Sequence, residues 1–157
     1  MNLHTLTIVH VAISLIGILS GLVVMFGLLV AQKLNAWIAL FLISTVLTSV
    51  TGFFFPFHGV TPAIVVGIIS LVLLAVAILA RYARHLAGHW RRIYVVTAMT
   101  ALYLNVFVLV VQLFQKVPVL KALAPTQSEP PFAVTQLVVL VLFILFTIIA
   151  AIRFRGE

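Results

Sequence analysis

The stretch PAIVVGIISLVLLAVAILAR, residues 62–81, decides the fold class. Its one charged residue, Arg81, stands at its end, and as an α-helix rising about 1.5 Å per residue it would span about 30 Å. This length matches the hydrocarbon layer of a bilayer. Because lipid offers the backbone no hydrogen-bond partners, such a segment is stable there as a helix. The sequence therefore predicts a membrane-spanning helix over residues 62–81.

Four more segments have the same character. They cover residues 7–31, 36–55, 93–115 and 132–152, and each is long enough and apolar enough to cross a bilayer. A shorter stretch, residues 118–124, begins at a proline and is typical of a helix that lies in the membrane interface. We therefore expect an all-α integral membrane five-helix bundle in which residues 1–157 form one domain.

The composition supports a membrane protein and argues against a nucleic-acid-binding one. Hydrophobic residues make up 65% of the chain and charged residues 7%, whereas soluble domains are about 45–50% apolar and about 25% charged. The net charge is +7, but the basic residues lie in short flanks between apolar segments, where they anchor helices to head groups. With no cysteine in the chain, disulfides, thiolate metal sites and thiol oxidoreductase chemistry are excluded.

The distribution of basic residues predicts an orientation. Lys33 follows the first segment, Arg153 and Arg155 follow the fifth, and four arginines lie between the third and the fourth. Cytoplasmic flanks carry the excess of Lys and Arg, so we expect these three regions inside, the N-terminus outside and the C-terminus in the cytoplasm. The first segment is too long for a signal-peptide core and has no convincing cleavage site, so we expect it to stay attached.

Small and polar residues indicate which helix faces pack together. His10, Ser14, Gly17 and Gly21 follow one another at spacings of four, three and four, which places them on one stripe of the first segment. Small residues of this kind let membrane helices approach closely. We therefore expect Ser14, Gly17 and Gly21 to serve helix packing, and the polar fourth segment to be the central helix.

The strongly polar residues concentrate in the predicted outer half. They are His10, His58, Asn105, Gln112 and Gln136. They are interpreted as the lining of an outward-facing, ligand-binding cavity, because polar groups at membrane depth often mark a site. The competing interpretation is that they hydrogen-bond helix to helix. His10 and His58 would also suit a transition metal or a haem, so the cofactor stays unassigned.

A basic and aromatic belt follows the third segment. His85 and His89 have the i, i+4 spacing that places two metal ligands on one helix face, but no third ligand lies nearby, and the metal set is left as none. The belt is instead interpreted as an anchor for anionic lipid head groups. Its residues are Arg81, Arg84, His85, His89, Arg91 and Arg92.

No pattern in the chain favours catalysis. It contains no HExxH sequence and no phosphate-binding glycine loop, so we expect a protein that is not an enzyme. The leading hypothesis is a membrane protein that binds a small apolar or amphipathic ligand such as a lipid, a quinone or a tetrapyrrole. One alternative is an oligomeric channel or facilitator lined by the fourth segment. Another is an accessory or assembly subunit of a respiratory complex. The expected partners are membrane lipids and a second copy or a larger membrane complex, with no nucleic acid.

The stretch ALYLNVFVLVVQLFQKVPVLKALAPTQSEPPF, residues 101–132, and the stretch TSVTGFFFPFH, residues 48–58, carry a resemblance. With them the chain resembles a group of small bacterial inner-membrane proteins of about this length that have no known activity. The resemblance implies a multi-pass protein of the bacterial inner membrane and adds no catalytic residue.

Overall fold

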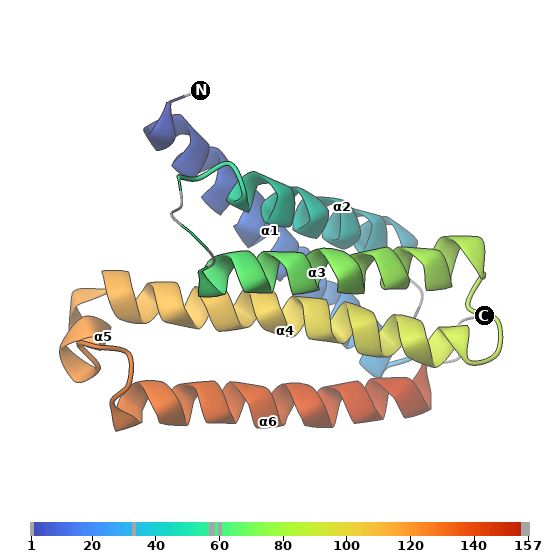
Figure 1. Ribbon diagram of the computed structural model, residues 1–157. Helices are drawn as coiled ribbons and strands as arrows, with labels where there is room; N and C mark the ends of the chain where they lie inside the picture. The colour runs from blue at the N-terminus through green and yellow to red at the C-terminus, as the bar shows by residue number, and fades with distance from the viewer. Residues whose placement is uncertain (1, 33, 57–58, 60, 155–157) are drawn as a thin grey trace.

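The computed structural model describes residues 2–32, 34–56, 59 and 61–154, and all regular structure in this part of the chain is helical. The elements are α1 (Leu3–Leu29), α2 (Asn35–Gly52), α3 (Pro62–Ile78), the π-helix η1 (Leu79–Ala83), α4 (Trp90–Lys116), α5 (Pro118–Leu123) and α6 (Pro130–Arg153) (Figure 1). Counting α3 with η1, five of these are long and apolar enough to cross a membrane. The predicted all-α fold is confirmed, and the chain is a multi-pass membrane protein.

The helices begin and end a few residues away from the bounds expected from the sequence. Caps and turns, which hydropathy does not show, decide where each helix begins and ends. α1 begins at Leu3 because the Asn2 side chain accepts a hydrogen bond from the Thr5 backbone N–H at 2.7 Å. α6 begins at Pro130, since proline is well suited to the first helical turn. α2 ends at Gly52, earlier than residue 55.

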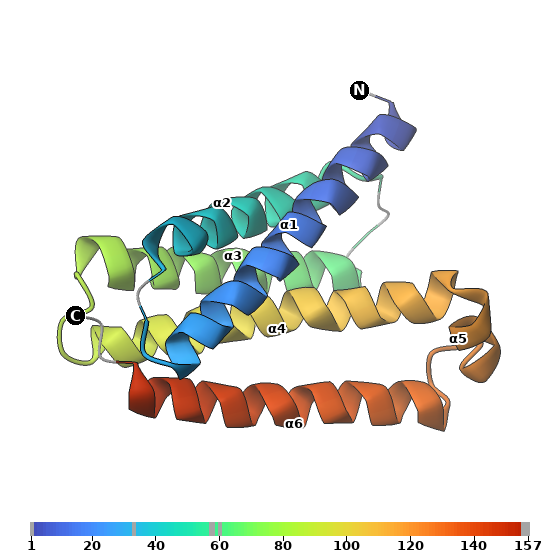
Figure 2. The same cartoon turned by 180° about the vertical axis from the view of Figure 1, so that it is seen from behind.

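The spanning helices run alternately up and down between two ends of the bundle (Figure 1, Figure 2). The start of α1, the α2–α3 connection and α5 lie at one end, which we call the α5 end. The α1–α2 connection, the α3–α4 turn and the end of α6 lie at the other, which we call the basic end. α4 is the central helix and contacts α1, α3, η1, α5 and α6, whereas α1 crosses the bundle obliquely and packs mainly on α2.

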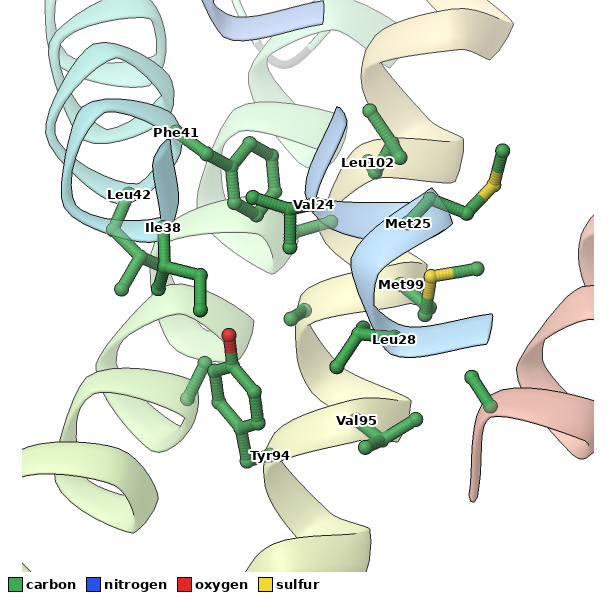
Figure 3. Packing of buried hydrophobic residues seen from close by; sticks show 14 of the residues in the cluster. Val24, Met25, Leu28, Ile38, Phe41, Leu42, Tyr94, Val95, Met99 and Leu102 are labelled. Carbon is green, nitrogen blue, oxygen red and sulfur yellow. The ribbon is translucent and has the colours of Figure 1, made fainter. Parts of the chain in front are cut away.

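The main core lies where α1, α2 and α4 meet (Figure 3). Val24, Phe41 and Leu102 converge there, one from each of these helices, and all are almost completely buried. Gly21 lets α1 come this close, because a Cβ on it would lie 2.9 Å from the Phe41 ring. In a bilayer such packing contacts hold helices together, since lipid tails are as apolar as the side chains.

A π-turn ends the third spanning helix and shapes the basic end. The Arg84 N–H donates to the Leu79 carbonyl at 2.9 Å, and the backbone is left-handed at His85 (φ 51°) and at Leu86 (φ 59°). The chain therefore leaves the helix at residue 84 and turns back toward α4. The expectation that His85 and His89 share one helix face is wrong, because residues 84–89 form this turn.

Candidate ligand-binding groove

His10 makes its polar contact with the neighbouring helix α2. Its Nδ1 lies 2.8 Å from the Thr51 Oγ1, and its ring meets the Phe55 ring edge-on at a centroid distance of 5.2 Å. Ser14, one turn further along α1, donates its hydroxyl to the His10 carbonyl at 2.7 Å. Gly17 follows on the same stripe and lies against Ser44 and Thr45. His10 and Gly17 therefore face α2, whereas the Ser14 hydroxyl bonds within α1.

The other polar residues of the predicted outer cavity lie in separate surroundings. The Asn105 amide donates to the Thr45 hydroxyl at 3.4 Å, and the Gln136 amide donates to the Phe107 carbonyl at 3.3 Å. Gln112 is exposed, and His58 lies outside the described residues. The polar residues therefore do not share one cavity lining. His10 and Asn105 contact α2, Gln136 contacts the backbone of α4, and Gln112 is exposed.

The His, Asp and Glu side chains do not gather into a metal site anywhere in the described ranges, where no group of three or more could hold an ion. His10 lies in α1 near the α5 end, while His85 and His89 lie in the turn at the basic end. The two histidines of the turn and His10 are therefore at opposite ends of the bundle.

A cleft with polar and apolar walls opens at the basic end. Its volume is about 600 Å³, and it lies between the start of α2, η1 and the end of α6. Its polar wall comes from three side chains, Asn35, Arg81 and His85, and its apolar wall includes Ala39, Tyr82 and Phe154. We call it the basic cleft.

Three contacts hold Arg81 in the wall of the basic cleft. Its guanidinium donates to the Asn35 Oδ1 at 2.5 Å and lies over the rings of Tyr82 and Tyr94, at 5.7 and 5.5 Å from their centroids. Stacking on aromatic faces and a hydrogen bond to an amide both suit a planar guanidinium. The hydrogen bond to Asn35 occupies one of its five N–H donors, so the fixed charge retains donors for a ligand.

The end of α6 closes one side of the basic cleft. The Phe154 ring is buried and lies 6.1 Å from the Tyr94 ring, and its carbonyl accepts a hydrogen bond from the Arg91 guanidinium. Arg91 therefore ties the end of α6 to the start of α4. Arg91 was expected to anchor lipid head groups, but part of its guanidinium is used by this contact inside the protein.

A second, apolar groove lies next to the basic cleft. It has a volume of about 400 Å³ and shares Ala39 and Tyr82 with the cleft. The rest of its lining is aliphatic and comes from α2 and α3: Leu42, Ile43, Val46, Leu47 and Ile78. We call it the apolar groove. The two spaces together offer a charged site beside a hydrocarbon-like surface.

The remaining belt residues surround the cleft without lining it. The Arg84 guanidinium lies 5.4 Å from the centre of the Trp90 ring, and the side chains of His89 and Arg92 are exposed. The described cations of the basic end are Arg81, Arg84, Arg91, Arg92 and Arg153, whereas the α5 end carries Lys116, Lys121 and the carboxylate of Glu129. Lys33 and Arg155, used in the orientation argument, lie outside the described residues.

Sequence reasoning singled out Arg81 and His85 but missed Asn35, Tyr82 and Phe154. Tyrosine at a helix end is typical of the membrane interface, so Tyr82 carried a readable signal. Asn35 stands at the start of α2, 46 residues before Arg81 in the chain, and no spacing rule connects the two. Phe154 follows the fifth segment, where no pattern in the sequence distinguishes it.

In comparisons with known proteins, no family model, no curated protein and no solved structure matched the chain. The resemblance of residues 101–132 to small bacterial inner-membrane proteins therefore gains no support from a matched relative.

Proposed function

We propose that this multi-pass membrane protein binds an amphipathic, lipid-like ligand and performs no catalysis. The observation that carries the proposal is that the basic cleft and the apolar groove are neighbours, since Ala39 and Tyr82 line both of them. A molecule with a polar head and a hydrocarbon chain would match both spaces at once. Burial of a chain against the aliphatic lining and of a head beside Arg81 would be favourable together.

The depth of the two spaces supports the same ligand class. The basic cleft lies beside the turn that ends the third spanning helix, where head groups are found, and the apolar groove runs from there along α2 and α3. A lipid-like ligand would therefore keep its ordinary orientation in the bilayer. This proposal retains the ligand class expected from the sequence and moves the site away from the His10 and Asn105 region, where the polar atoms already bond to α2.

The proposed orientation places the basic end in the cytoplasm and the α5 end outside. Five described arginines lie at the basic end, against two lysines and one glutamate at the α5 end, as the positive-inside rule requires. The resemblance of residues 101–132 favours the inner membrane of a bacterium. The ligand would then enter from the cytoplasmic leaflet.

Native mass spectrometry of the full chain from mild detergent tests the proposal. We expect the wild type to retain an added phospholipid and the Ala39→Trp variant to lose it, because Ala39 is half-buried at the junction of the two spaces. Ala133→Trp is the matched control, since Ala133 is exposed on α6 and lines neither space. Equal retention by the wild type and Ala39→Trp would rule out the groove as the site.

A further inference from the structure

We infer that the ligand of the basic cleft is a phospholipid with a net negative head group. The inference rests on the proposed function and adds the charge of the ligand and the residues that recognise it. Arg81 is placed as the main contact of the phosphate, and His85 as a second donor on the same wall. Tyr82 stands where the head meets the acyl chain, because it lines both spaces.

Charge complementarity is the first argument. None of the described residues that line the basic cleft is acidic, and Arg81 contributes a permanent positive charge to it. The chain has only two acidic residues; Glu129 lies at the opposite end of the bundle, and Glu157 lies outside the described residues. The cleft therefore holds a cation whose partner has to come from elsewhere.

Preorganisation is the second argument. Asn35 is a neutral acceptor, so its hydrogen bond positions Arg81 without neutralising it, and the rings of Tyr82 and Tyr94 fix the plane of the guanidinium. A guanidinium held in this way suits two parallel hydrogen bonds to phosphate oxygens. An exposed surface arginine such as Arg92 lacks these supports.

The apolar groove is the third argument, because it selects a lipid over a soluble anion. A free phosphate would use the charge of Arg81 but would leave the aliphatic wall formed by α2 and α3 without a partner. An acyl chain attached to the head group would cover that wall. Because lipid tails are as apolar as that wall, the chain would gain van der Waals contacts there, and its link to the head group would let the two parts bind together.

The test is a competition measured by native mass spectrometry on the full chain. The protein in mild detergent receives equal amounts of phosphatidylglycerol and phosphatidylcholine that carry the same acyl chains. We expect at least about fivefold preferential retention of phosphatidylglycerol, the factor that one basic residue contributes near a membrane surface. Arg81→Gln should abolish the preference, and Arg92→Gln, the same charge change on the same rim outside the cleft, should preserve it.

The outcomes separate this inference from the proposed function. If the wild type retains both lipids equally and Ala39→Trp loses both, the groove binds lipid and the inference of an anionic head group is overturned. If Ala39→Trp changes nothing, the proposed function itself fails. An unchanged preference in a folded Arg81→Gln protein would overturn the role of Arg81.

Two further measurements do not depend on the folding of Arg81→Gln. His85→Asn leaves the contact between Arg81 and Asn35 intact, and asparagine tolerates the left-handed backbone at this position, so the variant should fold and show a reduced preference. In the wild type, raising the salt concentration should weaken the retention of phosphatidylglycerol and leave that of phosphatidylcholine unchanged. A preference that is insensitive to both changes would contradict the inference.

Discussion

The Nδ1 of His10 and the Oγ1 of Thr51 lie 2.8 Å apart and join α1 to α2 near the α5 end. The Thr51 hydroxyl also lies 2.7 Å from the Leu47 carbonyl, to which it donates its one proton. It can therefore only accept from His10, so this contact requires the hydrogen on the Nδ1. The hydroxyl thus links the histidine to the backbone of α2.

This hydrogen bond should couple the two helices. In a double-mutant cycle with His10→Leu and Thr51→Val, we expect a coupling free energy of about 0.6 kcal/mol, with about 1.7 kcal/mol as the upper bound for interhelical hydrogen bonds in membranes. Reversible unfolding in mixed micelles measures it. If the two substitutions are strictly additive, His10 and Thr51 do not interact as described.

Gly21 should tolerate no larger side chain. A Cβ at this position would lie 2.5 Å from the Leu102 Cδ1 and 2.9 Å from the Phe41 ring, both of which belong to the buried core. We expect Gly21→Ala to reduce the free energy of unfolding by about 1–3 kcal/mol, the usual cost of overpacking. The transition of the purified protein in mixed micelles reports it.

Two other glycines are controls for this effect. At Gly17 the nearest atom to an added Cβ would be the Thr45 Oγ1 at 3.2 Å, and at Gly52 it would be the His10 Cε1 at 3.6 Å. Destabilisation should therefore fall from Gly21→Ala to Gly17→Ala to Gly52→Ala. A different order would contradict the described packing of α1 on α2.

The Tyr94 hydroxyl is the next test, because among the described residues no group meets the full geometry of a hydrogen bond to it, although the Arg81 guanidinium lies close by. The side chain is fully buried, and in Figure 3 its hydroxyl points toward Ile38. Burying an unpaired hydroxyl is unfavourable, so Tyr94→Phe should leave stability unchanged or raise it by up to about 1 kcal/mol. Tyr94→Ala, which also removes the ring, should cost about 3–5 kcal/mol. A marked loss in Tyr94→Phe would reveal a partner for the hydroxyl.

Glu129 makes the turn before α6 sensitive to pH. Hydrogen bonds to its carboxylate, first of all from the Thr126 hydroxyl, lower the pKa of Glu129 below its usual value. Because the pKa is lowered in the folded state, the stabilisation is present above the usual glutamate pKa and is lost as the pH falls through the lowered one. The turn should therefore loosen only in acid.

The experiment is a carboxyl-carbon NMR titration in a Glu157→Gln background, in which Glu129 is the only acidic residue left. Thr126→Val should raise the pKa of Glu129 toward its usual value, and Thr126→Ser, which keeps the hydroxyl, should leave it low. Equal pKa values in all three proteins would show that the hydroxyl is not the cause.

The sequence predicted the helices well because length and hydropathy are local properties. Residues 62–81 had to be a spanning helix whatever they packed against, and the stripe containing Gly17 and Gly21 correctly marked a face in contact with α2. The π-turn at Leu79–Ala83 was not predictable, since it depends on how the chain turns back toward α4. The helical pairing expected for His85 and His89 failed for this reason.

The groove could not be predicted, because its parts come from distant segments. Asn35 and Arg81 meet only once α2 and η1 lie side by side, and Ala39 joins two spaces that no periodicity reveals. The polar residues His10 and Asn105 were visible in the sequence, but hydrogen bonds to α2 use both of them. Sequence polarity indicated where helices pack more clearly than where a ligand would bind.

The proposed orientation can be tested directly, because the chain has no cysteine and any introduced one is unique. Ser128 lies in the turn before α6 at the α5 end, and Ala87 lies in the α3–α4 turn at the basic end; both are exposed. In intact cells, a membrane-impermeant maleimide should label Ser128→Cys, while Ala87→Cys should react only after the membrane is permeabilised. The reverse pattern would place the basic cleft on the outer face, and its ligand would then have to come from the outer leaflet.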